Sequence, residues 1–588
     1  MAKYSILFKS LLFWIIFTLL NVVLNTPEWI NQLLQSDYLS NGNSLTSPIN
    51  LFNAPQKGVL LNVFGEIVLL LFPLLLFGQY RLFKRIYVPL ASIVFLLILY
   101  YNIYLAVYLN LYSVHPIFEN DWIIVKEILP TFLNELSVQK GSYLIVLFGV
   151  LLSSLLLFLL HYYWQTVLIR HTIQPVFWAI SLGLISLFGI YQQQFSKDNF
   201  LFEENKSSNE NIFNWVYPNI QKSRSLNRKD PLIHLKKRWI YDVYLNKPLV
   251  KKKPNIYLLF IESYGGVATL TEYCSQPFAQ LSEQLESQLK SADWHISSNY
   301  SKSTVIGGRS WLAMTTAMTG ARIEDQIQYN GLLNEHQTYP HMIAYFNKQG
   351  YETVRVSTMS SNKIDTMQMI TIPNLFWGFD QRYMYSDIPY KGYKYDYYGG
   401  IPDQYTLGHI QEAILDKAER PYFMTFITMN SHGPWSNAPP IVENWRTMDT
   451  LQNPFPNGRP KLGMDISQYW ELMEFELKLL TKFILENGEE DSVFILLGDH
   501  NPAGLEWKLK GRFNKWATPI HIISKDKKFV DSFHQHGFTE GMQVDTSKFT
   551  IMRHMGLYSI LTRQLLENYG EKEVVLPEYL PWGLDLAK

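Results

Sequence analysis

The sequence predicts a multi-pass α-helical membrane domain followed by an α/β domain, in which a mostly parallel sheet is covered by helices on both faces. Two observations lead to this prediction. Five apolar stretches before residue 195 are each long enough to cross a bilayer core of about 30 Å. After residue 254, short apolar runs alternate with helical patterns. We therefore divide the 588 residues into a membrane domain (1–192), a juxtamembrane linker (193–253) and a C-terminal α/β domain (254–588).

The membrane domain is predicted from stretches rich in Leu, Phe and Ile. They are Ile6–Leu24, Val59–Gly78, Tyr87–Leu109, Ser142–Tyr163 and Pro175–Tyr191. No cleavage site of small residues follows the first stretch, so we interpret it as an anchor rather than a removed signal peptide.

Basic residues in the short loops predict the orientation. Arg81, Lys84 and Arg85 lie between the second and third stretches, and Arg170 lies between the fourth and fifth. By the positive-inside rule these loops and the N-terminus are cytoplasmic. An odd number of spans then places the α/β domain outside the cytoplasm, on a multi-pass protein of the cell membrane.

The α/β domain is predicted from alternating elements. Strands are expected at 256–261, 352–357, 422–429 and 493–497, and helices at 340–349, 404–415 and 470–485. In open sheets of this kind, reactive groups gather beyond the carboxyl ends of the strands.

Polar side chains follow three of these strands. Glu262 follows the first, His432 lies just after the third, and Asp499 and His500 follow the fourth. Carboxylates and a neutral imidazole together suit Mn²⁺ or Zn²⁺, with Mg²⁺ as a further candidate. We therefore expect one divalent metal at this edge of the sheet.

A hydroxyl-rich stretch, Tyr300–Trp311, supplies candidates for a nucleophile. It contains Ser303, Thr304 and Ser310, with Gly307-Gly308 before a helical segment. A hydroxyl near a helix N-terminus is well placed to handle a phosphate or sulfate. Ser310 also fits an ordinary helix cap, so these residues leave the choice open.

The motifs together resemble a known family. Phe260–Gly265, Ser303–Trp311, Asn430-Ser431-His432 and Leu497–His500 resemble the sulfatase-like branch of the alkaline phosphatase superfamily. With five amino-terminal spans, the chain is similar to membrane phosphotransferases of the lipoteichoic acid synthase type. Gly307–Ala313 and Pro402–Leu407 are similar to motifs of uncharacterised membrane sulfatase-like proteins of bacteria.

The resemblance implies an alkaline phosphatase-like fold and roles for individual residues. Glu262, Thr304, Asp499 and His500 would bind the metal, and Thr304 would be the nucleophile that forms a covalent intermediate. Ser303 and Ser310 remain alternative nucleophiles, because the turn between Thr304 and Ser310 is longer than the family pattern. His432 would contact the phosphoryl group or donate a proton to the leaving group.

Two arginines, Arg309 and Arg355, are candidates to bind an anionic part of the substrate, because a guanidinium matches phosphate geometry. The pattern that leads to formylglycine in arylsulfatases is absent around Cys274.

The resemblance and the predicted topology together suggest a function. We expect a transferase that moves a phosphorylated lipid headgroup to an extracytoplasmic glycan or lipid acceptor. The alternative is a phosphate- or sulfate-ester hydrolase of the same superfamily. The balance of 51 basic and 51 acidic side chains argues against a nucleic-acid partner.

Overall fold

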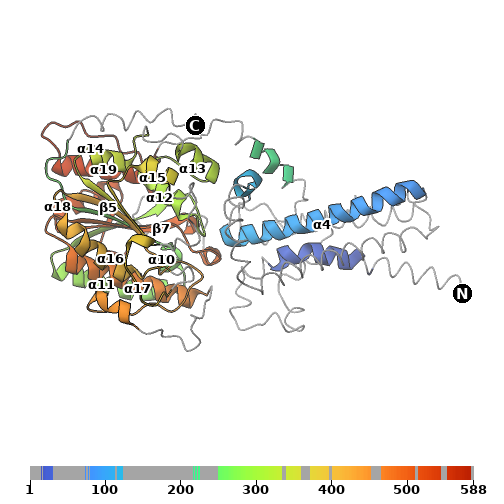
Figure 1. Ribbon diagram of the computed structural model, residues 1–588, viewed down its shortest axis with the longest axis horizontal. Helices are drawn as coiled ribbons and strands as arrows, with labels where there is room; N and C mark the ends of the chain where they lie inside the picture. The colour runs from blue at the N-terminus through green and yellow to red at the C-terminus, as the bar shows by residue number, and fades with distance from the viewer. Residues whose placement is uncertain are drawn as a thin grey trace. The chain divides into compact units, whose positions relative to one another are not determined.

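The computed structural model describes residues 15, 17–30, 70, 73, 77, 80–112, 116–122, 216–217, 219–221, 223–224, 249–333, 339–358, 371–395, 400–451, 465–509, 514–544 and 552–583 (Figure 1). The chain forms two compact units, Met1–Ser225 and Leu226–Lys588.

The N-terminal unit contains a long apolar helix, α4 (Arg81–Tyr112). Among the described residues, its segment Arg81–Leu109 is the one helix long and apolar enough to cross a membrane. It includes the third predicted span, and residues 17–30, which overlap the first span, are helical. Nearly all of the second span, and all of the fourth and fifth, lie outside the described residues. The five-span domain therefore stays a prediction.

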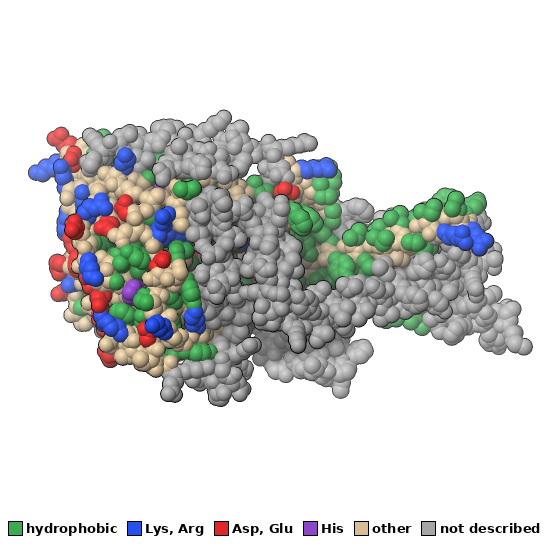
Figure 2. Space-filling view, viewed as in Figure 1, with side chains coloured by type: hydrophobic (Ala, Val, Ile, Leu, Met, Phe, Trp, Pro, Cys, Tyr) green, Lys and Arg blue, Asp and Glu red, His purple; other side chains and the backbone are tan. Residues whose placement is uncertain are grey.

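The α4 helix exposes large apolar side chains along its length, and basic residues mark its beginning (Figure 2). Leu82, Ile86, Leu90 and Leu97 are all exposed. Such a surface is typical of a helix that contacts lipid or other apolar helices.

The C-terminal unit is built on a nine-stranded sheet with the order β4-β3-β5-β1-β6-β7-β2-β8, and β9 also pairs with β2. The strands are β1 (Ile256–Ile261), β2 (His295–Lys302), β3 (Glu352–Ser357), β4 (Gln381–Met384), β5 (Tyr422–Ile427), β6 (Val493–Gly498), β7 (Ala517–Ser524), β8 (Thr539–Glu540) and β9 (Met552–Arg553). The four strands expected from the sequence are β1, β3, β5 and β6.

The sheet is mixed, but five of its eight strand pairs are parallel, in agreement with the predicted mostly parallel sheet. Strands β4, β3, β5, β1 and β6 are parallel, whereas β7 is antiparallel to both β6 and β2, and β8 is antiparallel to β2. The connection from β6 to β7 contains only short 3-10 turns among its described residues. Without a crossover helix the chain returns directly, and a direct return gives antiparallel pairing.

Helices cover both faces of this sheet, as the sequence predicts (Figure 1). On one side lie α10 (Val267–Leu270), α11 (Ser275–Ser291), α16 (Asp403–Ala413) and α17 (Ile466–Asn487). On the other lie α12 (Ser310–Thr319), α13 (Gln326–Leu333), α14 (Met342–Lys348), α15 (Thr371–Trp377), α18 (Lys527–Asp531) and α19 (Leu557–Tyr569).

The central strand β1 joins the two hydrophobic cores. Ile256, Leu258 and Phe260 pack into one core, while the intervening Tyr257, Leu259 and Ile261 pack into the other. All six are completely buried. A strand fixed on both faces gives the residue that follows it, Glu262, a rigid base.

Candidate active site

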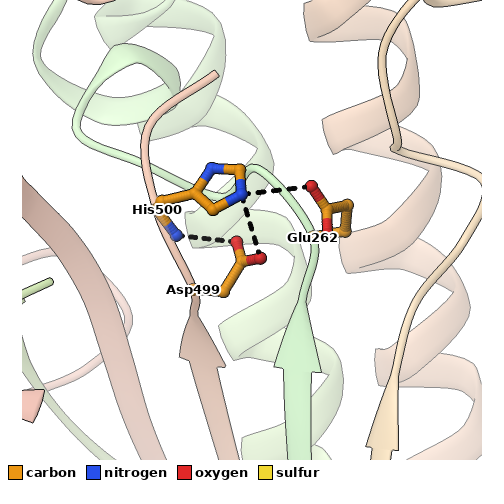
Figure 3. Close-up of side chains that lie close together, drawn as sticks. All are labelled: Glu262, Asp499 and His500. Atoms are coloured by element: carbon orange, nitrogen blue, oxygen red, sulfur yellow. Dashed lines mark hydrogen bonds and ion pairs between the residues drawn. The ribbon is translucent and has the colours of Figure 1, made fainter. Parts of the chain in front are cut away.

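Three of the four predicted metal ligands, Glu262, Asp499 and His500, converge at the carboxyl ends of two adjacent strands (Figure 3). Glu262 follows β1, and Asp499 and His500 follow β6, which is paired in parallel with β1. One ligand atom from each residue lies within 4.8 Å of the others. His500 Nε2 lies 3.4 Å from Glu262 Oε1 and 3.3 Å from Asp499 Oδ2. All three side chains are buried.

Backbone groups hold these side chains in place. The amides of Ser263 and His500 donate to Asp499 Oδ1 at 2.8 and 2.7 Å. The Glu262 amide donates to Thr428 Oγ1 at 3.0 Å, which ties the end of β1 to the end of β5. His500 Nδ1 lies 2.9 Å from the Asn501 carbonyl oxygen. A carbonyl accepts only from a protonated Nδ1, so a neutral His500 presents the lone pair of Nε2 to both carboxylates.

The protonation states fit a site built for a cation. Burial, followed by the charge of Glu262, raises the pKa of Asp499 well above its ordinary value. Burial also acts to raise the pKa of Glu262, but the nearby imidazoles of His432 and His500 and the hydrogen bond from Ser310 outweigh it, and the pKa is lowered. Burial lowers the pKa of His500, which keeps the ring neutral.

Glu262, Asp499 and His500 together suit a divalent metal. Asp499 Oδ2 is buried and has no hydrogen-bond donor among the described residues. Two buried carboxylates beside an imidazole lone pair form an O/N ligand set of the kind that Zn²⁺ and Mn²⁺ accept. A bound cation would neutralise the negative charge of both carboxylates.

Of the three candidate hydroxyls, Ser310 is the one that reaches this group. Its Oγ donates to Glu262 Oε2 at 2.8 Å and lies 3.2 Å from His500 Nε2. Ser310 is the first residue of α12 and is half-buried. The turn before it contains three residues with positive φ, Gly307 (70°), Gly308 (124°) and Arg309 (63°). After this turn, α12 begins beside the metal ligands Glu262 and His500.

The other two hydroxyls are bonded elsewhere. Thr304 Oγ1 lies 3.2 Å from Thr316 Oγ1, and Thr316 Oγ1 in turn accepts from the amide of Ile323. Ser303 Oγ donates to the Asp499 backbone oxygen at 2.6 Å. The structure therefore brings Ser310, and not Thr304, to the carboxylates, while Ser303 supports the backbone of a ligand.

His432 and Arg309 act on this site through their charge. The charge of His432 lowers the pKa of both Glu262 and His500, and the charge of Arg309 also lowers the pKa of His500. His432 is half-buried, and its Nδ1 lies 2.7 Å from the Gly433 carbonyl oxygen. Because a carbonyl oxygen only accepts, this Nδ1 carries a proton.

Arg355 lies at a different place. It is the fourth residue of β3, and its guanidinium donates to Asn374 Oδ1 at 3.3 Å. No hydrogen bond or ion pair between described residues joins it to Glu262, Asp499 or His500.

Two supporting residues were not singled out from the sequence. Thr428 Oγ1 accepts a hydrogen bond from the Glu262 amide. The buried Asn501 accepts from the Val267 amide at 2.9 Å and donates to the Lys515 and Ala517 carbonyls. Thr428 lies one residue past β5, and Asn501 lies one residue past His500. This placement just beyond strand ends could have indicated both residues.

This fold and this site define a class of protein. An α/β domain with a buried Glu-Asp-His group at its strand ends, and a hydroxyl at a helix N-terminus beside it, suits metal-dependent chemistry on phosphate or sulfate esters.

Comparison with known families agrees with this class. Residues 255–538 match the family model of the sulfatases, so this part of the chain is a sulfatase-like enzyme domain. The resemblance to the sulfatase-like branch of the alkaline phosphatase superfamily is thereby confirmed.

Several solved structures are similar to the chain. A lipoteichoic acid synthase of Listeria monocytogenes is 12% identical, with coverage of 59% of this chain and 80% of that one and a TM-score of 0.36. A phosphoglycerol transferase of Streptococcus pyogenes, in complex with sn-glycerol-1-phosphate, is 14% identical, with coverage of 57% and 80% and a TM-score of 0.36. A protein of the alkaline phosphatase superfamily from Vibrio parahaemolyticus is 14% identical, with coverage of 60% and 78% and a TM-score of 0.33. A search of curated protein sequences found no match.

Proposed function

We propose that the chain is a metal-dependent, membrane-anchored transferase. It moves a phosphorylated lipid headgroup onto Ser310 and then onto a glycan or lipid acceptor outside the cytoplasm. The observation that carries the proposal is the position of Ser310 Oγ, which contacts both Glu262 and His500 at the start of α12. The membrane domain (1–192) and the linker (193–253) would keep the catalytic domain (254–588) near lipid headgroups, where their effective concentration is high.

Glu262, Asp499 and His500 would hold one divalent cation, Mn²⁺ or Zn²⁺, with Mg²⁺ as a further candidate. When bound, such an ion supplies positive charge that lowers the pKa of a hydroxyl and stabilises charge on phosphoryl oxygens.

The chain's own residues account for the movement of protons. As Ser310 Oγ forms its bond to phosphorus, its proton has an acceptor in Glu262, whose carboxylate already receives that hydrogen bond. The bond from phosphorus to the lipid alkoxide breaks, and His432 donates the proton that the alkoxide needs. In the second half, the acceptor hydroxyl gives its proton to His432 and attacks phosphorus, and Ser310 leaves with its proton restored.

The start of α12 and Arg309 would hold the transferred group. The first backbone amides of a helix point at a ligand beyond its N-terminus and favour negative charge there. Arg309 directly precedes this terminus and lies near enough to His500 to affect its pKa. Both contributions favour an anionic phosphoryl group beside Ser310.

Peptide mass spectrometry tests the proposal directly, because trypsin separates the candidate hydroxyls. Cleavage after Lys302, Arg309 and Arg322 places Ser303 and Thr304 on one peptide and Ser310 on the next. The full chain, purified in detergent with Mn²⁺ or Zn²⁺ and incubated with phosphatidylglycerol vesicles, should gain the mass of phosphoglycerol on residues 310–322. Ser310→Ala should remove this mass and lower transfer by about a thousandfold or more.

Thr304→Val is the matched control. It should keep the adduct and most of the activity, because Thr304 contacts Thr316 rather than the ligands. An adduct on residues 303–309 would contradict the assignment of Ser310. Release of free headgroup at an undiminished rate without any acceptor would instead identify a hydrolase. Chelation should abolish the adduct, and adding back each metal separately would identify the ion.

A further inference from the structure

The motif Pro402–Leu407 has no role in the chemistry described above, although it begins a helix beside the site. Asp403 is the first residue of α16 and is completely buried. An N-cap aspartate usually accepts from the amides of its own helix, but Asp403 follows the N-cap residue, Pro402. Here its carboxylate faces a different element, the turn that follows β5.

Asp403 binds this turn through its backbone. Both carboxylate oxygens accept from the Met429 amide, at 2.9 and 2.8 Å, and Oδ2 also accepts from the Asn430 amide at 2.8 Å. In return, the Asp403 amide donates to Asn430 Oδ1 at 2.9 Å. The His432 amide donates to the Met429 carbonyl at 3.1 Å, so the turn held by Asp403 is the one that carries His432.

The turn is also tied to the metal ligands. Thr428 Oγ1, which accepts from the Glu262 amide, lies 3.1 Å from Ser431 Oγ. The position of His432 relative to Glu262 therefore depends on one short segment, residues 428–431. Asp403 fixes the middle of that segment.

A second buried carboxyl, Glu476 of α17, interacts electrostatically with Asp403. Glu476 is completely buried. Burial, followed by the charge of Asp403, raises the pKa of Glu476 well above its ordinary value, whereas the Ser431 amide acts to lower it. Glu476 is therefore neutral, and both Asp403 and Glu476 interact with the turn at residues 429–431.

We propose that Asp403, backed by Glu476, is a positioning residue that holds His432 where it can give a proton to the leaving group. The inference rests on the proposed function, in which His432 is the acid. It assigns to Asp403 no contact with substrate or metal. Its effect should therefore appear only in the step that requires the proton.

A pair of substrates with different leaving groups tests this. Phosphatidylglycerol releases an alkoxide, which needs a proton, whereas a p-nitrophenyl ester of glycerophosphate releases a stable phenolate, which does not. In the full chain with Mn²⁺, Asp403→Asn should lower kcat for phosphatidylglycerol by about 10- to 100-fold and change kcat for the nitrophenyl ester by less than about threefold. His432→Ala should show the same pattern, and the double variant should lose no more than His432→Ala alone.

Conservative and control variants separate positioning from general loss of structure. Glu476→Gln keeps a neutral side chain of the same size and should retain activity, whereas Glu476→Ala should reproduce the pattern of Asp403→Asn. Asp465→Asn removes a carboxylate that caps α17 through the Ser467 and Gln468 amides and does not contact the turn. It should leave the ratio of the two activities unchanged. Hydrogen exchange at the Met429 and Asn430 amides should accelerate in Asp403→Asn and Glu476→Ala but not in Asp465→Asn.

The outcomes distinguish the two proposals. If His432→Ala slows both substrates equally, His432 is not the acid, and the proposed function is wrong at that step. If His432→Ala discriminates between leaving groups but Asp403→Asn slows both substrates equally, or adds to the loss in His432→Ala, the positioning role is overturned while the proposed function stands.

Discussion

Buried histidines hold together the antiparallel part of the sheet behind the site. His521 of β7 is completely buried, with Nδ1 at 2.6 Å from Ser298 Oγ and Nε2 at 3.0 Å from Tyr264 OH. His554 lies 2.8 Å from Ser301 Oγ and 3.2 Å from the Asp499 backbone oxygen. Burial lowers the pKa of His521 to about 3 and that of His554 to about 4. Both rings are therefore neutral in the folded protein.

These low pKa values predict acid sensitivity. An unfolded chain binds a proton at each histidine below about pH 6.5, whereas the folded protein does not until pH 3 to 4. The free energy of unfolding should therefore be full above pH 6.5 and decrease as the pH falls toward 4, with a slope of up to about 1.4 kcal/mol per pH unit for each histidine. Denaturant unfolding between pH 4 and 7 measures this slope. His521→Gln should reduce it, and an unchanged slope in that variant would contradict the prediction.

The sequence predicted some site residues and left others open for a physical reason. Glu262, Asp499 and His500 each follow a short apolar strand, so their place at one edge of the sheet follows from local pattern alone. The position of Ser310, rather than Thr304, beside these residues does not follow from local pattern. It depends on the left-handed backbone at Arg309 and on the contact between Thr304 and Thr316, a residue of α12. The sequence has no short-range signal for either.

At the scale of elements, the site depends on the close approach of two strand ends. A Cβ atom added to Gly498, the last residue of β6, would lie 1.8 Å from the Tyr264 carbonyl oxygen. A Cβ atom added to Gly265 would lie 2.0 Å from Asn501 Oδ1. These glycines allow the segment after β1 to cross directly over the segment after β6, which brings Glu262 to Asp499 and His500.

We predict that Gly498→Ala disrupts both the fold and the site. The obstructing atom is a backbone oxygen, which cannot rotate away, so the strands must separate at a cost of about 3 kcal/mol or more. Metal titration and thermal unfolding of the same sample measure the two effects. Normal metal affinity in a stable Gly498→Ala variant would show that the approach of the strands is not required.

Strand β2 shows why part of the sheet could not be predicted from the sequence. Its sequence, His295–Lys302, is polar and gives no apolar run, yet six of its eight residues are buried. Ser298 and Ser301 can be buried because His521 and His554 bond their hydroxyls. Those partners come from more than 200 residues later in the chain, so only the folded structure makes this strand recognisable.

At the scale of the whole molecule, the single cysteine makes the membrane topology directly measurable. Cys274 is completely buried, and burial raises the pKa of its thiol to about 11. A buried, protonated thiol reacts poorly with maleimides. New cysteines can therefore be placed in the natural sequence without interference from Cys274.

We predict that the residue at the start of α4 and the residues that follow this helix in the chain are labelled from opposite sides of the membrane. Leu82, Trp122 and Val575 are 72%, 55% and 82% exposed, so each can be replaced with little effect on packing. On intact cells, an impermeant maleimide should label Trp122→Cys and Val575→Cys but not Leu82→Cys. Labelling of all three after permeabilisation is the control. The reverse pattern would contradict the orientation inferred from Arg81, Lys84 and Arg85.

The short strands at the margin of the sheet have a consequence for solubility. Two-residue strands, β8 and β9, pair with the outer side of β2 at Ser297-Ser298 and at Ser301-Lys302. At the opposite margin, β4 has only four residues and includes the exposed Arg382. A long, bare margin would offer unpaired amides and carbonyls on which another chain could add a strand and begin to aggregate. That protection matters most where many copies of the protein lie at high local density.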